Sequence, residues 1–273
     1  MRKYRLARER LLSTGLFEFA EAPLAPRDAI ERVHAPAYVH AFLHGALTPA
    51  AIRRIGFPWS PQLVTRTLAS AGGTLAATRQ ALASGVGGTL AGGTHHAFHD
   101  YGSGFCVFND IAIAAVDCGL RAAVVDLDVH QGDGTAALLR HNPRVLTLSL
   151  HGRNNFPFRK QQSVIDVELD DGVTDNQYLD ILAETLPRVW QFQPEIVFYQ
   201  SGVDALAEDR LGRLSLTLDG LRRRDEMVFA PCRASSIPIV ITLGGGYAQP
   251  IELTAQAHAN TFLTARRVFG PAP

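Results

Sequence analysis

Short apolar runs rich in valine, isoleucine and leucine alternate along this chain with segments of helical length, and this alternation limits the folds open to it. Four apolar runs stand out, at 122–125, 145–150, 196–200 and 237–243. Buried strands of a parallel sheet have this composition. The segments of helical length lie at 64–84, 109–119, 176–192, 215–234 and 250–268. The repeated order of strand and helix predicts an α/β fold of three layers, α/β/α, in which helices cover both faces of a central, mainly parallel sheet.

The organisation of the chain favours a single domain over residues 1–273. Its length, with 47% hydrophobic and 19% charged residues, is enough to bury a large core. No internal repeat, low-complexity tract or Pro/Gly-rich linker divides the sequence. Basic and acidic residues are equal in number, 26 of each, so the formal net charge is zero. This balance argues against direct binding of nucleic acid, which usually requires a basic excess.

Several absences in the sequence bear on where the protein acts. The N-terminus is charged and lacks the apolar stretch of a secretory signal. No apolar run is long enough to span a bilayer. The three cysteines form no Cys-x-x-Cys pair, which favours a reducing compartment over a disulfide framework. We therefore expect a cytoplasmic protein.

Polar residues gather directly after the apolar runs. They are Asp126, Asp128 and His130 after the first run, His151 after the second, Asp204 after the third, and residues 244–247 after the fourth. In open α/β sheets, ligands bind outside the carboxyl ends of the strands. We therefore expect four separate segments to deliver chemical groups to one edge of the sheet.

The Asp-Leu-Asp-Val-His sequence at 126–130 suggests a metal site. Polar residues at alternate positions would place Asp126, Asp128 and His130 on one side of an extended segment. Carboxylate oxygen and imidazole nitrogen together suit zinc, and such a hard donor set would also accept iron(II). Asp204 is the natural third ligand, although a single Asp after a strand is more often a turn or helix-capping residue. Three protein ligands would leave a coordination position open, as in catalytic sites.

Two adjacent histidines, His95 and His96, follow a pair of glycines. Imidazoles titrate near neutral pH, so such a pair can supply a general base and an electrostatic stabiliser. Asp126 and Asp133 are available to orient them, because a catalytic imidazole usually has its second nitrogen held by a carboxylate. Taken alone, the histidine pair is weak support, since surface histidine pairs are common.

Aromatic residues occur in three glycine-rich or polar loops. Tyr247 follows three glycines, and its hydroxyl could donate a hydrogen bond to a developing oxyanion. Gly104 and Phe105 in one loop, with Phe156 in another, could wall a narrow slot for an alkyl chain. For the phenylalanines, packing in the core is an equally good interpretation, and a tyrosine in a loop often packs on the surface.

Four segments of the chain resemble, in order, the four signatures of the histone-deacetylase superfamily, which has the arginase/deacetylase fold. They read GGTHHAFHDYGSGFCVFND, VVDLDVHQGDGTA, SGVDALAEDRLGRLS and GGGY. The stretch EDRLGRLSLTLDGLRRRDEMVF is most similar to the class IV branch and its bacterial relatives. The resemblance covers nearly the whole chain, and it is specific because four motifs recur in order with compatible spacing.

The resemblance implies a role for each motif residue. Zinc would be bound by Asp128, His130 and Asp204, and Tyr247 would polarise the carbonyl of the substrate. A structural potassium ion is implied at Asp126, Asp128, His130, Ser149 and Leu150.

The resemblance also implies a mechanism. His95 and His96 would be the tandem catalytic histidines, with Asp126 paired to the first and Asp133 to the second. His96 would take a proton from the attacking water, and a protonated histidine would then donate to the leaving amine. The chain would thus be a metal-dependent hydrolase of linear amide C–N bonds.

The substrate channel is also implied by the resemblance. Phe105 and Phe156 would form its aromatic walls next to Gly104, and Leu211 would lie at its rim. Arg5 would correspond to an arginine near an internal exit channel.

The implied substrate is an N-acyl amine, first of all ε-N-acyl-lysine in proteins or peptides, with an acetyl or a longer acyl group. Acetylpolyamines or other small acyl amines are an alternative, but Arg210, which precedes the rim residue Leu211, is not the acidic residue that would attract a polyamine. A catalytically silent acyl-lysine-binding module is a second alternative. A binuclear manganese ureohydrolase is a third, but it would need an aspartate where Gly202 stands.

The start of the chain departs from the family pattern. Relatives usually carry a short strand and a loop before the helix that corresponds to residues 1–12, whereas this sequence enters the helix directly. We expect the missing loop to widen the mouth of the active site and the missing strand to remove an outer strand of the sheet.

Overall fold

The central sheet of the protein is wholly parallel. A computed structural model describes residues 2–270, and within them the strands form one six-stranded sheet in the order β1-β6-β5-β2-β3-β4. The strands are β1 (Val86–Gly88), β2 (Ala122–Asp126), β3 (Val145–Gly152), β4 (Ile165–Leu169), β5 (Ile196–Gln200) and β6 (Ile239–Thr242). The helices are α1 (Arg2–Ser13), α2 (Arg27–Glu31), α3 (Pro36–Leu43), α4 (Pro49–Ile55), α5 (Pro61–Ser84), α6 (Asp110–Cys118), α7 (Asp133–Leu139), α8 (Asp175–Gln191), α9 (Leu218–Ala234) and α10 (Ile251–Phe269). The predicted α/β class and parallel sheet are confirmed.

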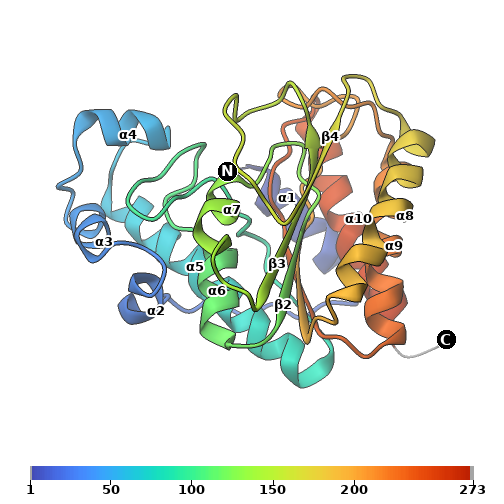
Figure 1. Cartoon of the computed structure of the whole chain (residues 1–273), viewed down its shortest axis with the longest axis horizontal. Coiled ribbons are helices and arrows are strands. Elements are labelled where there is room, and N and C mark those ends of the chain that lie inside the picture. The colour runs from blue at the N-terminus through green and yellow to red at the C-terminus, as the bar shows by residue number, and fades with distance from the viewer. Residues whose placement is uncertain (1, 271–273) are drawn as a thin grey trace.

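Helices cover both faces of the sheet, as Figure 1 shows, with α5, α6 and α7 on one side and α8, α9 and α10 on the other. Successive side chains of a strand point to opposite faces. In β5, Phe198 joins the apolar cluster that includes α5 and α6, and the next residue, Tyr199, joins the cluster that includes α8 and α9. Both side chains are fully buried. The continuous apolar runs of the sequence therefore reflect strands that are buried on both faces.

The two edge strands lack the long apolar runs that identify the inner strands, and sequence analysis missed both. In β1, Gly87 packs so closely on α5 that a Cβ atom would overlap the carbonyl oxygen of Ala77. Close packing thus replaces side-chain bulk at this edge. In β4, the buried Ile165 and Leu169 enclose exposed acidic residues, the alternation expected of a half-exposed strand.

The predicted inner strands and long helices match the structure to within a few residues. β5 has the predicted bounds, β2 runs one residue further to Asp126, and β6 is shorter than its apolar run. The longest helix, α5, begins and ends at residues that commonly cap helices. The Ser60 side chain caps its start by accepting the N–H of Leu63 at 3.1 Å, and Gly85, with φ of 87°, ends it. The short helices α2, α3, α4 and α7 were not predicted.

The three neighbouring strands β6, β5 and β2 end at the same edge of the sheet. Each continues into a polar loop: β2 into residues 127–132, β5 into residues 201–204, and β6 into residues 243–247. Because parallel strands bring their carboxyl ends together, residues far apart in sequence meet here. Across the part of the chain that the structure describes, no helix combines the length and apolar character needed to cross a bilayer.

Candidate active site

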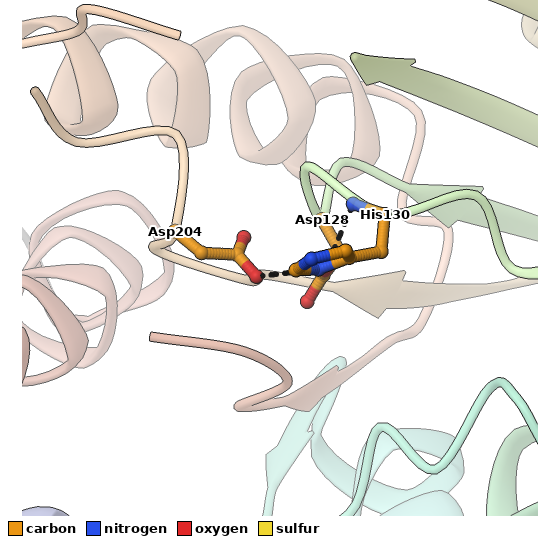
Figure 2. Close-up of side chains that lie close together, drawn as sticks. All are labelled: Asp128, His130 and Asp204. Carbon is orange, nitrogen blue, oxygen red and sulfur yellow. Dashed lines mark hydrogen bonds and ion pairs between the residues drawn. The ribbon is translucent and has the colours of Figure 1, made fainter. Parts of the chain in front are cut away.

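Asp128, His130 and Asp204 converge beyond the ends of β2 and β5 (Figure 2). The Nδ1 atom of His130 lies 3.0 Å from Oδ1 of Asp128 and 3.0 Å from Oδ2 of Asp204. One ligand atom from each residue lies within 4.8 Å of the others. Among residues 2–270 this is the one group of three or more His, Cys, Asp or Glu side chains placed in this way. The spacing fits a single bound cation.

The carboxylates of this group are buried and held by backbone donors. The N–H of Gly245 donates to Oδ2 of Asp128 at 2.7 Å, and the N–H of Val129 donates to Oδ1 of Asp204 at 3.0 Å. Burial, together with the nearby charge of Asp128, raises the pKa of Asp204 to about 6. A divalent cation would neutralise the two adjacent carboxylates, and their oxygens with an imidazole nitrogen suit zinc or iron(II). The residues present therefore fit such an ion.

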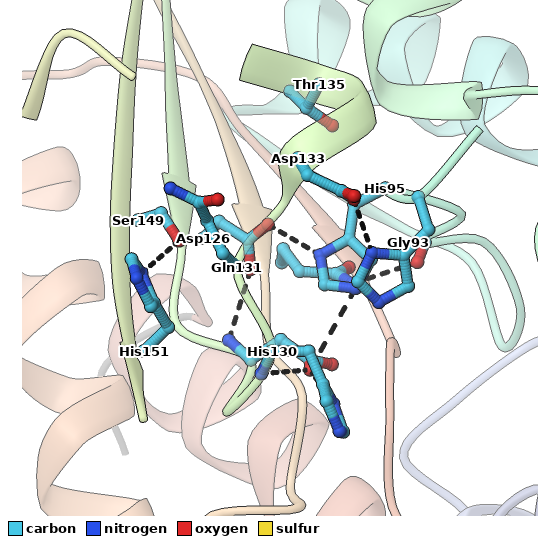
Figure 3. Close-up of polar contacts among 12 residues, drawn as sticks. Gly93, His95, Asp126, His130, Gln131, Asp133, Thr135, Ser149 and His151 are labelled. Atoms are coloured by element: carbon cyan, nitrogen blue, oxygen red, sulfur yellow. Dashed lines mark hydrogen bonds and ion pairs between the residues drawn. The ribbon is translucent and has the colours of Figure 1, made fainter. Parts of the chain in front are cut away.

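The strand β2 ends at Asp126, which corrects the prediction that an extended segment carries Asp126, Asp128 and His130 on one side. Oδ1 of Asp126 accepts the N–H of Asp128 at 3.1 Å, as in an Asx turn, and the chain bends after it. Oδ2 of Asp126 lies 2.7 Å from Nδ1 of His95 (Figure 3). The first acid of the motif thus orients a histidine and does not join the metal group.

Each histidine of the adjacent pair contacts its own carboxylate. His95 pairs with Asp126, and Nδ1 of His96 lies 2.7 Å from Oδ1 of Asp133, the first residue of α7. All four side chains are buried, and the imidazole rings are 4.0 Å apart. A carboxylate on Nδ1 fixes the proton there, so the Nε2 atom of each neutral ring can accept a proton.

The two rings differ in proton affinity. Burial, with the neighbouring charge of His95, lowers the pKa of His96 to about 4, although Asp133 acts in the opposite direction. Burial would also lower the pKa of His95, but the carboxylates of Asp126 and Asp128 outweigh it and raise the value to about 9. In the protein without its cation, His96 is therefore neutral at pH 7 and able to act as a base.

Tyr247 is positioned by the glycine turn that follows β6. Burial raises the pKa of its phenol to about 12, so the hydroxyl is protonated and can donate. The N–H of Tyr247 donates to Oδ2 of Asp209 at 2.6 Å. Gly246 has a φ of 142°, a conformation that glycine adopts readily and other residues rarely do. Tyr247 lines the same cavity as Asp128 and His96.

Lys3 was not predicted as a site residue, yet its ammonium supports this turn. Nζ of Lys3 donates to the carbonyl oxygens of Gly244 and Gly246 at 3.2 Å each. Arg5, expected near an internal channel, is instead exposed and lies 3.6 Å from Glu9. The buried side chains of α1 are Lys3, Ala7 and Leu11. Their spacing of four residues was the signal that could have identified Lys3.

The residues expected to form the channel line one cavity of about 650 Å³ together with the metal group, the histidine pair and Tyr247. Gly104 lies where a Cβ atom would be 2.7 Å from the His96 ring and 3.2 Å from the Phe156 ring, so no larger residue fits without a shift. The ring of Phe156 stands nearly perpendicular to His96 at 4.9 Å. Phe105 packs on Phe57, which does not line the cavity, at 5.1 Å between ring centroids.

The rim residue Leu211 and the expected potassium residue Ser149 lie outside the metal group. Leu211 is 48% exposed and lines the same cavity. Ser149 pairs with Asp126 in the register of β2 and β3, and its hydroxyl lies 3.0 Å from Nδ1 of His151 (Figure 3). His151 lies within β3, not after it, and is buried outside the cavity. The second apolar run therefore contributes no side chain to the cavity.

Comparison with known proteins finds a matching family model, similar sequences and a similar solved structure. Residues 1–263 match the family model described as the histone deacetylase domain. The chain is 45% identical over 278 residues to an uncharacterized protein of Picosynechococcus sp., an alignment that covers 98% of this chain and 93% of that protein. It is 38% identical to histone deacetylase 2 of Arabidopsis thaliana over 64% of this chain and 48% of that protein, so it spans only about half of this relative. An acetylpolyamine aminohydrolase of Burkholderia pseudomallei has a similar fold, with a TM-score of 0.77, 21% identity, and coverage of 97% of this chain and 90% of that one.

Proposed function

The chain belongs to the histone deacetylase family, and on that premise we propose that it hydrolyses the amide of an N-acyl amine, first of all the ε-N-acyl group of a lysine side chain. One observation carries the proposal. A single cavity is lined by the Asp128–His130–Asp204 group, by both adjacent histidines and by Tyr247. These are the groups needed to bind a cation, accept and donate a proton, and stabilise an oxyanion.

We propose zinc as the metal, held by Asp128, His130 and Asp204, with iron(II) as an alternative for this hard donor set. Such an ion, when bound, polarises a carbonyl oxygen and lowers the pKa of water. A structural potassium ion at the end of β3, near Ser149 and Leu150, remains a proposal, supported by the position of Ser149 beside Asp126.

The residues around the metal group would transfer protons and stabilise the developing negative charge. His96 accepts a proton from the attacking water through Nε2, and Asp133 holds its ring in position. The Tyr247 hydroxyl donates a hydrogen bond to the amide oxygen as negative charge develops there. When the C–N bond breaks, a protonated histidine of the pair gives its proton to the leaving nitrogen. The products are a carboxylate and a free amine.

The substrate stem would lie between Phe105 and Phe156. Phe105 is 47% exposed and Phe156 is 36% exposed, so both rings retain apolar surface for an alkyl chain. An acylated lysine satisfies this shape, because its four-carbon stem is apolar and its amide lies at the far end.

Hydrolysis of a panel of acyl-lysine peptides, from acetyl to myristoyl, together with acetylated polyamines, tests the proposal. The purified protein is assayed after loading with zinc and after removal of metal by a chelator. We expect metal-dependent release of the free amine from at least one class. Stoichiometric zinc with no release from any substrate would overturn the enzymatic proposal and favour an acyl-lysine-binding role.

A further inference from the structure

Among the charged side chains that line the cavity with the metal group, cations outnumber acids. The charged residues along its wall, apart from the histidines, are Lys3, Arg53, Arg54, Arg66, Arg213, Asp128 and Asp204. Both acids are in the metal group, where a divalent cation would balance their charge. The four arginines remain protonated at any physiological pH. A substrate that enters this cavity therefore meets positive potential without a compensating acidic wall.

The arginine on α5, Arg66, packs on a phenylalanine that supports the aromatic wall of the cavity. The guanidinium carbon of Arg66 is 4.8 Å from the ring centroid of Phe57, and Phe57 in turn contacts Phe105. Arg66 lines the same cavity as Lys3, Tyr4 and Tyr247. Arg66 thus shares one cavity wall with both Phe105 and Tyr247.

Two other arginines of the cavity are also held in place. The guanidinium carbon of Arg54 lies 4.7 Å from the centroid of Tyr101, and Arg213 contacts Asp171 at 3.3 Å. A guanidinium that stacks on a ring uses its face, whereas its N–H donors lie along its edge in the geometry that binds carboxylate and phosphate. The arrangement is thus suited to an anionic group on a substrate.

We propose that this cavity selects N-acyl amines that carry a carboxylate or phosphate and disfavours polycationic ones, with Arg66 as the principal specificity-determining residue. The inference deepens the proposed amide hydrolysis and rests on it for the reaction. A protonated polyamine would meet four arginines and no unengaged acid in the cavity wall, so electrostatic repulsion would weaken its binding. The anionic group can come from the acyl chain or from the amine side of the substrate.

Binding of matched metal-chelating probes tests the charge preference without turnover. Three hydroxamates of equal length, with tails ending in a methyl, a carboxylate or an ammonium group, are titrated into the zinc-loaded protein by calorimetry. We expect the carboxylate probe to bind on the order of tenfold more tightly than the ammonium probe, because one charge-assisted hydrogen bond has about this effect. The preference should shrink as ionic strength rises. Equal affinities, or a preference for the ammonium tail, would overturn the inference.

Two arginine variants test whether Arg66 causes the preference for the carboxylate probe. Arg66→Gln should remove most of the advantage of the carboxylate probe. The matched control is Arg79→Gln, an exposed arginine on the same helix that does not line the cavity and lies about 20 Å further along the axis. It should keep the full preference. A preference that survives in Arg66→Gln would contradict the role given to Arg66.

Kinetic comparisons then identify where the substrate carries its charge. Glutaryl-lysine is compared with hexanoyl-lysine in one peptide, and acetyl-lysine flanked by glutamates is compared with acetyl-lysine flanked by glutamines. A higher kcat/KM for the first member of either pair, reduced by Arg66→Gln, supports the inference and assigns the charge to the acyl or the amine side. Equal kcat/KM within both pairs would overturn it. Absence of turnover with every peptide would reject the proposed hydrolysis, while the probe titration would still decide the charge preference.

Discussion

The ammonium of Lys3 lies 4.7 Å from the ring centroid of Tyr247 and so joins the first turn of the chain to the last loop of the site. Its two hydrogen bonds go to the carbonyl oxygens on the turn just before the tyrosine. Lys3 is 5% exposed. Burial lowers its pKa, and the carboxylates of Asp204 and Asp128 oppose that effect. A residue near the N-terminus thus supports the group that we propose to polarise the substrate.

Replacement of this lysine should impair turnover. Lys3→Met leaves two buried carbonyl groups without their donor, at a cost of roughly 1–3 kcal/mol, and so loosens the position of the tyrosine. We expect kcat to fall by about tenfold or more with a smaller change in KM, and Lys3→Arg to retain more activity. The matched control is Arg5→Met, on the same helix but exposed, which should be close to wild type. An unchanged kcat in Lys3→Met would contradict the supporting role.

The proton-accepting and carbonyl-polarising roles predict a separation between metal binding and activity. His96→Ala and Tyr247→Phe should each lower kcat by a factor of about 100 or more. Neither side chain belongs to the metal group, so both variants should retain one zinc per chain by atomic emission spectroscopy. Near-normal rates in both variants would refute the mechanism.

Removal of a proposed metal ligand should instead lower both the zinc content and the activity. Asp204→Ala deletes a fully buried carboxylate that contacts His130, so zinc content after dialysis should fall far below one per chain and activity should be lost with it. Glu208→Ala, an exposed acid in the same loop, serves as the control and should retain zinc. Full zinc retention in Asp204→Ala would show that the metal is bound elsewhere.

The buried His34 predicts acid sensitivity of the fold that is independent of the metal. Nδ1 of His34 donates to the carbonyl oxygen of Phe98 at 2.8 Å, and Nε2 accepts the N–H of Asn109 at 2.9 Å, so both nitrogens are used in the neutral ring. Burial lowers its pKa from 6.5 to about 4. The unfolded chain therefore binds a proton below pH 6.5 that the folded chain does not bind until about pH 4.

The neutral His34 therefore contributes to the free energy of unfolding in full above pH 6.5, and this contribution is lost as pH falls toward 4. The loss is on the order of 3 kcal/mol. Urea unfolding at pH 7.5, 5.5 and about 4.5 measures it. The variant His34→Gln, which can keep one donor and one acceptor, should show a shallower decline. His44→Gln removes an exposed histidine and should follow wild type. Identical pH profiles for wild type and His34→Gln would rule out this source of acid sensitivity.

The inner part of the fold was predictable because it depends on local composition. Strands buried on both faces must be continuously apolar, so β2, β3, β5 and β6 were evident as runs of Val, Ile and Leu. The edge strands were not evident. β1 consists of a valine and two glycines, and its place beside β6 is set by how closely α5 approaches it. β4 alternates apolar and acidic residues over only five positions, and it pairs with β3 at the other edge of the sheet.

The candidate site was likewise predictable in part from the sequence and in part only from tertiary packing. The sequence by itself determined which groups were available, namely two acids and a histidine at the end of β2, an acid after β5, adjacent histidines and a tyrosine after three glycines. Only the tertiary structure decided the contacts that neither the sequence nor the family resemblance implied. Asp126 ends β2 and accepts the N–H of Asp128, Lys3 reaches the glycine turn, and four arginines from three segments line one cavity. The physical reason is that alternation and spacing specify the direction of a side chain only within one regular element, whereas these contacts join loops whose relative positions are set by the packing of the whole sheet.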